Sequence, residues 1–206
     1  MKTTRKSKLL KLGFYAAIAA GALLNSQATL AGDAPPLYQP DPDSPIGERN
    51  QNAAPELAQY DFLIGDWDVE ITWTYPNQAP SKNRAKWHNH WIIDGKAVML
   101  EWRGPQFTGA EIRSWHAQEK KWVGVNLYPD FGGDFNPATS EKIGDKMYVT
   151  IPTNGPDGAY INRETYYDIE ADGYKMKSEH SYDRGETWQP GLYEMTVWRS
   201  QVMGSE

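Results

Sequence analysis

Cysteine is absent from this chain of 206 residues. Its absence excludes disulfide bonds, thiolate metal sites, cysteine nucleophiles and lipid attachment through cysteine. An exported protein without disulfides depends on its own core for stability. The chain also has no apolar run of the roughly 20 residues that a membrane-spanning helix requires. We therefore expect a soluble domain that is held together by packing.

Common catalytic patterns are missing as well. No glycine-rich phosphate loop precedes a helix. Ser114, Ser178 and Ser181 occur in strand or turn contexts, whereas a serine nucleophile of the hydrolase type sits on a strand-to-helix elbow. Carboxylates are numerous, but no spacing singles out an acid–base pair. The sequence thus assigns no catalytic residue, and we expect no cofactor.

Residues 1–31 have the features of a secretory signal peptide. Five basic residues and no acid occur in MKTTRKSKLLK, about 13 mostly apolar residues follow, and the small-residue stretch NSQATLAG comes next. Cleavage after Ala28 or after Ala31 fits this order. We therefore expect a periplasmic or secreted protein.

Acidic residues outnumber basic ones in the rest of the chain. Without the five basic residues of the leader, 16 basic residues face 27 acidic ones, a net charge of about −11. Nucleic acid is not an expected partner, because phosphate binding requires clustered Lys and Arg. Residues 32–58 contain six prolines and few large apolar groups, which predicts an unstructured N-terminal arm. The folded domain is then expected over residues 59–206.

Apolar and polar residues alternate almost throughout the chain after Tyr60, which is typical of half-buried strands. Within 66–75 one face carries Trp67, Val69, Ile71, Trp73 and Tyr75. Further strands are predicted over about 84–93, 96–102, 109–116, 121–128, 146–152, 160–169, 174–182 and 187–199, with a weaker one near 136–142. Eight to ten antiparallel strands with short turns predict an all-β meander, closed as an up-and-down barrel or folded as a sandwich.

The dipeptide Asp94-Gly95 predicts a two-residue hairpin turn with positive φ at both positions. This turn pairs Trp87 with Trp102, and cross-strand partners share a face. The inward face of the hairpin is then expected to carry Trp87, Trp91, Val98, Leu100 and Trp102, with Asn89 as a polar contact.

The stretch SYDRGETW, residues 181–188, resembles the Asp-box of sialidase propellers. Ser181 and Asp183 can bond local backbone, Gly185 permits unusual dihedrals, and Trp188 can pack beneath the turn. The box occurs once, and the domain is too short for a propeller built from many four-stranded blades. We therefore interpret it as a hairpin turn and not as a mark of glycosidase activity.

His88 and His90 share one strand face, and Glu101 lies opposite His88 in the predicted register. Two histidines alone do not make a zinc site, which needs three or four protein ligands. Since this face is expected to point outward, we predict no metal site.

The stretch DFLIGDWDVEITW resembles the first strand of lipocalin-like proteins, with Gly65 and Trp67 as their G-x-W motif. Arg199 in the last strand resembles the arginine that packs across that tryptophan. The order of segments over about 59–200 is similar to that of bacterial, often exported, lipocalin-like domains without an assigned function. The resemblance implies a calycin-type antiparallel barrel and implies no substrate.

Three functions fit such a barrel. The first is binding of a small apolar or aromatic molecule in the interior, where the candidate contacts are Trp73, Trp87, Asn89, Trp91 and Trp102. The second is an enzyme of the hydratase, isomerase or cyclase type, which needs an inward acid or base such as Glu111, Arg113, Glu164 or Tyr166. The third is a structural or protein-binding domain with a filled core.

Overall fold

The computed structural model describes residues 47–155 and 158–200. The predicted leader, residues 1–31, and the arm up to residue 46 lie outside the described residues. The described part contains no helix that is long and apolar enough to cross a membrane.

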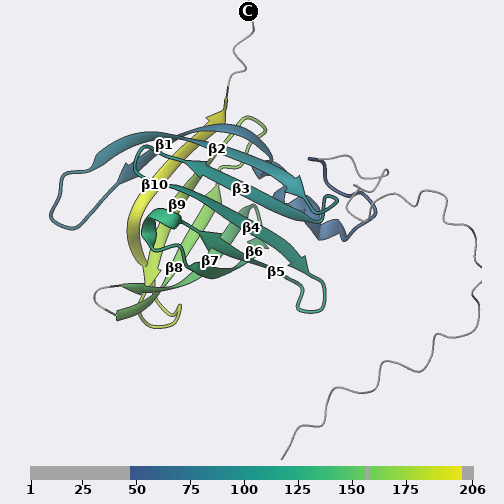
Figure 1. Ribbon diagram of the computed structural model, residues 1–206. Coiled ribbons are helices and arrows are strands. Elements are labelled where there is room, and N and C mark those ends of the chain that lie inside the picture. The colour runs from purple at the N-terminus through teal and green to yellow at the C-terminus, as the bar shows by residue number, and fades with distance from the viewer. Residues whose placement is uncertain (1–46, 156–157, 201–206) are drawn as a thin grey trace, which may run out of the picture. The chain divides into compact units, whose positions relative to one another are not determined.

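Ten antiparallel strands form a closed barrel, in which each strand pairs with the next in sequence and β10 pairs with β1 (Figure 1). The fold class is therefore the predicted all-β up-and-down barrel. Two short 3-10 helices accompany the strands, η1 (Pro55–Leu63) and η2 (Pro129–Phe131). The strands are β1 (Gly65–Trp73), β2 (Ser81–Ile92), β3 (Ala97–Arg103), β4 (Thr108–His116), β5 (Lys121–Leu127), β6 (Phe135–Ile143), β7 (Lys146–Gly155), β8 (Gly158–Tyr167), β9 (Gly173–Ser181) and β10 (Gln189–Arg199).

The up-and-down order places alternate connections at opposite ends of the barrel. We call the end that η1 covers the closed end; it carries the β2–β3, β4–β5, β6–β7 and β8–β9 turns. We call the other the open end; it carries the β1–β2, β3–β4, β5–β6, β7–β8 and β9–β10 connections. Helix η2 belongs to the β5–β6 connection and therefore lies at the open end.

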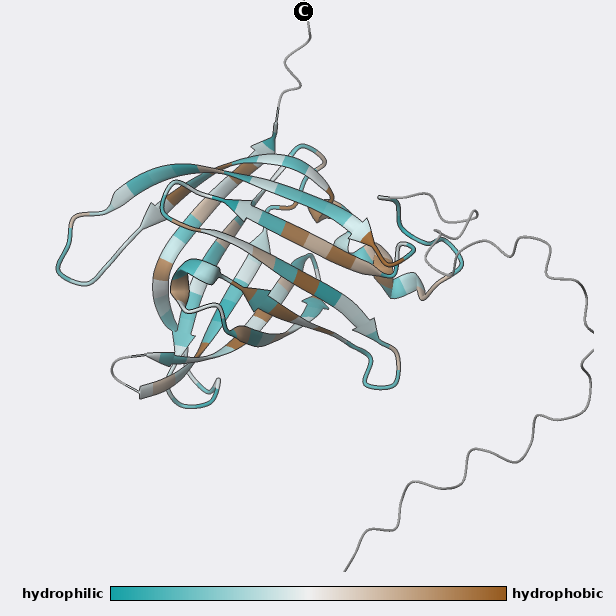
Figure 2. Ribbon diagram, in the orientation of Figure 1, coloured by the Kyte–Doolittle hydropathy of each residue, from teal (hydrophilic) through white to brown (hydrophobic). Residues whose placement is uncertain are grey.

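Apolar and polar residues alternate along most strands (Figure 2). In β1 the inward residues Trp67, Val69 and Ile71 are buried as predicted, whereas Trp73 is half-buried. Tyr75 lies beyond the end of the strand and is exposed. Successive residues of the strand thus point alternately to the inside and the outside of the barrel, which explains the period of two in the sequence.

The β2–β3 hairpin has the predicted register, including Trp87 opposite Trp102 and Asn89 opposite Leu100. Asp94 and Gly95 both have positive φ, and Lys96 N donates to Ile93 O over 3.1 Å. Ile93 also has a positive φ of 53°, so the strand ladder ends at the pair of Ile92 and Ala97, one pair earlier than predicted.

Helix η1 closes its end of the barrel by burying Leu57, Tyr60 and Leu63. Trp67 Nε1 donates to Leu63 O over 2.7 Å, which ties the first strand to this helix. Residues 47–58, assigned to the arm by composition, also lie against the barrel: Gly47 bridges to Trp91. Part of the segment that composition assigns to the arm is thus in contact with the barrel.

Arg199 packs across Trp67 as the lipocalin resemblance implies, with its guanidinium carbon 3.8 Å from the ring centroid. Its nitrogens also donate to Ile64 O over 2.5 Å and to Ala171 O over 3.2 Å. A side chain at Gly65 would collide with Arg199, and Gly65 has a φ of 129°. Glycine is thus required at this position of the motif.

The Asp-box stretch forms the turn between β9 and β10, as predicted. Asp183 accepts hydrogen bonds from Ser181 Oγ, Thr187 N and Thr187 Oγ1, and these bonds lower its pKa to about 2. Gly185 has a φ of 95° and donates its N–H to Ser181 Oγ over 2.7 Å. Trp188 stacks on Arg163 at 3.7 Å, on the outside of β8.

Candidate functional site: a half-aromatic cavity

A cavity of about 270 Å³ occupies the barrel toward its open end. It is smaller than the pockets that hold drug-sized ligands, which start near ~300 Å³. A cavity of about 150 Å³ is enough for benzene, so this one has room for a molecule of one or two rings. Its lining consists of Trp73, Trp87, Trp102, Phe107, Glu111, Asn126, Tyr128, Phe131, Asn136, Ile151, Thr153, Asn162, Glu164, Met176, Tyr193 and Met195.

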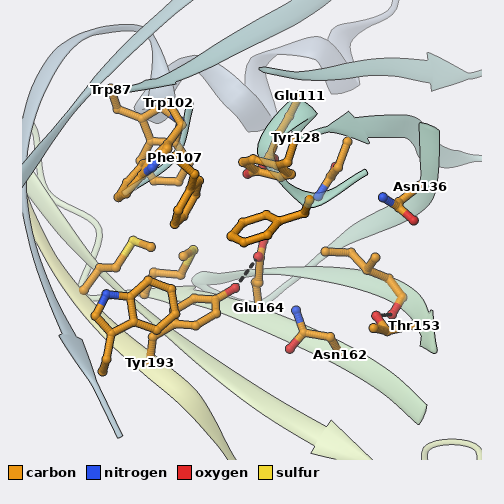
Figure 3. Close-up of a pocket in the computed structure, with 16 residues that line it drawn as sticks. Trp87, Trp102, Phe107, Glu111, Tyr128, Asn136, Thr153, Asn162, Glu164 and Tyr193 are labelled. Atoms are coloured by element: carbon orange, nitrogen blue, oxygen red, sulfur yellow. Dashed lines mark hydrogen bonds between the residues drawn. The ribbon is translucent and has the colours of Figure 1, made fainter. Parts of the chain in front are cut away.

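One side of the cavity is an aromatic wall made of Trp73, Trp87, Trp102 and Phe107. Trp87 and Trp102 meet edge to face at 5.5 Å, and Trp102 stacks on Phe107 at 5.7 Å. Figure 3 shows Trp87, Trp102 and Phe107 together on one side, across the cavity from Asn136 and Thr153. These ring contacts hold the wall in a fixed shape.

A buried ion pair lies on the β4 side of the cavity. Arg113 Nη2 lies 2.6 Å from Glu111 Oε2, and both side chains are at most 3% exposed. Burial alone would lower the pKa of Arg113, but the negative charge of Glu111 raises it above its usual value. Tyr128 OH donates to Glu111 Oε1 over 2.5 Å. Arg113 does not line the cavity, so its charge affects the cavity by neutralising Glu111, which does line it.

The sequence makes room for this arginine with Gly124, its partner across the β4–β5 ladder. A Cβ at Gly124 would lie 2.8 Å from Arg113 Cδ and 2.0 Å from Ile112 O. Arg113 Nη1 also donates to Val125 O over 3.1 Å. The guanidinium is thereby fixed to the barrel wall as well as to the carboxylate.

Glu164 is a second buried carboxyl and lines the cavity directly. Tyr193 OH donates to its Oε1 over 2.6 Å, as Figure 3 shows, whereas its buried Oε2 has no hydrogen-bond partner. Burial, and secondly the charge of Glu111, raise the pKa of Glu164 to about 7. A carboxyl group of this kind takes up and releases protons near neutral pH.

Other buried polar atoms of the lining are also without partners. They are Asn126 Oδ1, Asn162 Oδ1, Trp87 Nε1 and Trp102 Nε1. Unpaired buried polar atoms are rare in native proteins and costly, and five of the nine such side-chain atoms in the described residues belong to this lining.

The cavity reaches the surface beside η2. Phe131, at the end of that helix, is 68% exposed and yet belongs to the lining. It contacts Phe107 at a ring distance of 4.9 Å, and Phe107 lies in the β3–β4 connection. Two connections of the open end thus frame the mouth of the cavity.

Three of the five aromatic and polar residues selected from the sequence line the cavity: Trp73, Trp87 and Trp102. Asn89 and Trp91 are not part of this lining. Both lie near the closed end, because the shared face of β2 runs along the whole barrel. Asn89 Nδ2 donates to Leu63 O over 2.9 Å, and Trp91 packs into the core.

Among the acids and bases proposed for an enzyme, Glu111 and Glu164 line the cavity, whereas the buried Arg113 and Tyr166 do not. Sequence reasoning missed most of the remaining lining residues. Strands β4 and β5 explain part of this, because their polarity is inverted: Glu111 and Asn126 are buried, while Ile112 is 37% exposed. The usual alternation, with apolar residues inside and polar residues outside, thus fails in these two strands. Such exceptions to local sequence rules are expected at functional sites.

The histidine pair lies outside the cavity. His88 Nδ1 contacts Asp66 Oδ1 at 2.5 Å, and both side chains are substantially exposed. Residues 47–155 and 158–200 contain no group of three or more His, Asp or Glu arranged to hold a metal ion.

No protein-family profile matches the chain, and no curated protein matches it. The solved structures that resemble it in part include two proteins without an assigned activity in their descriptions. Rv2717c from M. tuberculosis is 14% identical, with a TM-score of 0.45 over 73% of this chain and 100% of that one. A protein of unknown function from the DUF3598 family of Nostoc punctiforme is 16% identical, with a TM-score of 0.39 over 78% of this chain and 52% of that one.

Proposed function

We propose that the protein binds a small, mainly aromatic or apolar molecule inside the barrel. The observation that carries this proposal is the cavity of about 270 Å³, which has an aromatic wall on one side and unpartnered polar atoms in its lining. Rings offer a large contact area, and a few polar groups fix the orientation of a ligand. The cavity favours this function over a structural domain with a filled core.

Binding can be tested with phenethyl alcohol, a neutral one-ring probe that fits the volume. Tryptophan fluorescence reports on it, because Trp73, Trp87 and Trp102 line the cavity. The variant Thr153→Phe fills the cavity from β7. Its control is Thr150→Phe on the same strand, since Thr150 is not part of the lining.

We expect Thr153→Phe to weaken probe binding by about tenfold or more, the loss of roughly 1.4 kcal/mol of binding free energy. Thr150→Phe should bind like the wild type. Equal affinity in all three proteins would place the probe outside the barrel and contradict the proposal.

A second candidate function is proton-transfer catalysis on an apolar carbonyl compound, and Glu164 favours it. Its pKa of about 7 and its unpartnered Oε2 are suited to a general base. Phenylacetone in D2O tests this function, because removal of its α-proton leads to deuterium incorporation that NMR detects. Catalysis requires faster incorporation with the wild type than with Glu164→Gln; equal rates would rule out this role of Glu164 toward such a ketone.

We also propose that the barrel acts outside the cytoplasm, on the strength of the leader-like residues 1–31. N-terminal sequencing of the protein recovered from a bacterial periplasm or medium tests this. A new N-terminus after Ala28 or Ala31 is expected, and an intact Met1 would contradict it.

A further inference from the structure

The charges inside the barrel leave one carboxyl group without a counter-ion. Among the residues that the structure describes, two acids, Glu111 and Glu164, and one base, Arg113, are buried there. Arg113 is bound to Glu111 at 2.6 Å, so that pair is neutral as a whole. The one side-chain hydrogen bond that Glu164 accepts among the described residues comes from the neutral hydroxyl of Tyr193. An ionised Glu164 therefore carries an uncompensated negative charge into the cavity, and such a charge is unfavourable until a cation pairs with it.

The unpartnered atoms on the polar side are acceptors, whereas the two unpartnered donors of the lining, Trp87 Nε1 and Trp102 Nε1, belong to the aromatic wall. The acceptors are Glu164 Oε2, Asn126 Oδ1 and Asn162 Oδ1, and all three residues line the cavity. Carboxylate and amide oxygens accept hydrogen bonds, so a ligand that satisfies them must bring donors. An ammonium group has three N–H donors and no acceptor, which matches this set.

The aromatic wall is also suited to a positive charge. The faces of Trp, Tyr and Phe rings are negative and attract a cation within about 6 Å of the centroid. Trp73 lies 5.2 Å from the ring of Tyr193, and Tyr193 in turn bonds Glu164. Tyr193 thus connects the aromatic wall to the carboxyl group of Glu164. One small molecule can therefore contact the wall and this carboxyl group at the same time.

We propose that the ligand is a small organic amine, bound as its ammonium ion with the N–H groups on Glu164 and its apolar body on the aromatic wall. The proposal deepens and rests on the function proposed above, because it names the class of molecule that the same cavity binds. It commits to a cationic ligand, whereas the cavity alone also accommodates neutral and acidic molecules of the same size.

The affinity for an amine should depend on pH. The titratable and charged groups that face Glu164 are Glu111 and Arg113 from β4, Tyr128 after β5 and Tyr193 from β10. Tyr166, on the same strand as Glu164, also interacts with it, and burial raises the pKa of Tyr166 well above its usual value. Burial raises the pKa of Tyr128 and of Tyr193 well above the usual value, so both stay neutral. Since the pKa of Glu164 is about 7, this group changes charge over the neutral range. Protonation removes the anion that the ammonium needs.

A matched pair of probes tests the ligand class. Phenethylamine and phenethyl alcohol have nearly the same shape, and the amine remains an ammonium ion across the neutral range. We expect the wild type to bind the amine at least about tenfold more tightly at about pH 8, the strength of a hydrogen bond between charged groups. The affinity for the amine should fall by about a hundredfold between about pH 8 and about pH 5, because the ionised fraction of Glu164 falls tenfold per pH unit below its pKa of about 7. The preference for the amine over the alcohol should then be lost.

Two variants locate the effect. Glu164→Gln keeps the shape and removes the charge, and it should lose the preference for the amine while it still binds the alcohol. Glu70→Gln removes a carboxylate of β1 that pairs with Lys82, and Glu70 does not line the cavity. Glu70→Gln should keep the preference, so a loss in both variants would mean that overall charge attracts the amine.

The outcomes separate the two proposals. Binding of the alcohol without a preference for the amine in the wild type overturns the ligand class and leaves the proposed function intact. A preference that persists at about pH 5 also overturns it, and that measurement needs no variant to fold. If neither probe binds, both proposals fail together.

Discussion

The two ends of the barrel use polar side chains in different ways. At the closed end, Trp67, Asn89 and Arg199 each donate to a backbone carbonyl of Leu63 or Ile64. In the cavity, toward the open end, the polar side chains bond one another, and Glu164 Oε2 has no partner. The closed end also has buried polar atoms without partners, Asn89 Oδ1 and Tyr174 OH. Among the described residues, however, the one buried carboxylate oxygen without a partner, Glu164 Oε2, lies in the cavity.

Arg199 at the closed end and Arg113 beside the cavity illustrate this difference between the two ends. Arg199 is exposed and rests on an indole face and two carbonyls, so no other charge depends on it. Arg113 is buried and balances Glu111. Removing a partner from a buried ion pair leaves a bare charge in a medium of low dielectric constant, which costs far more than the loss of a surface contact.

Replacing Arg113 should have the largest effect. Arg113→Met fills similar space but leaves Glu111 buried without its cation, which we expect to lower the free energy of unfolding by about 3–5 kcal/mol. Urea denaturation near pH 7 measures this. The double variant Glu111→Gln with Arg113→Met should recover part of the loss, and a double variant as unstable as the single one would contradict the assigned pairing.

Glu164→Gln should increase stability above neutral pH. The folded-state pKa of Glu164, about 7, lies above its ordinary value of 4.5, so the folded protein holds this proton more tightly than the unfolded chain. The stabilisation that this provides is complete below about pH 4.5 and is lost as the pH rises through about 7, a change on the order of 3 kcal/mol. Unfolding measured across this range should show a shallower fall for the variant; parallel curves would exclude Glu164 as the buried acid.

Arg199→Met tests the closed end. It removes the contact with Trp67 and the bonds to Ile64 O and Ala171 O, and we expect a loss of about 1–2 kcal/mol, smaller than for Arg113. Affinity for the phenethyl probes should be unchanged, because Arg199 lies away from the cavity. A loss equal to that of Arg113→Met would remove the distinction between the two ends.

The smallest effect is expected at the β9–β10 turn. Asp183→Asn weakens the bonds that organise the turn, and since these bonds hold the pKa of Asp183 at about 2, the variant should lower the melting temperature at neutral pH. Probe affinity should stay within about twofold, because neither Asp183 nor Trp188 lines the cavity. Loss of binding would show that the turn belongs to the site.

Sequence alone predicted the barrel better than the site. Alternation in β1 and the Asp94-Gly95 turn identified a buried face and its register, because those signals are local and agree with each other. The same face then included Asn89 and Trp91, which are buried but do not line the cavity. A period of two distinguishes inside from outside, but it does not show how far along the barrel axis a residue lies.

Local features of the sequence determined the class of fold and the turn at Asp183, since each depends on residues that are near in sequence or on a strict alternation. The joint at Gly65 and Trp67 also needs Arg199 from the last strand, and it was predicted from the resemblance to lipocalin-like proteins. Only the tertiary structure brought Glu111 of β4, Glu164 of β8 and Tyr193 of β10 around one cavity. Closure of ten strands places them together, and it also removes the water that would otherwise keep the pKa of Glu164 ordinary. The chemistry of this barrel therefore arises from burial, which no single segment of the sequence can specify.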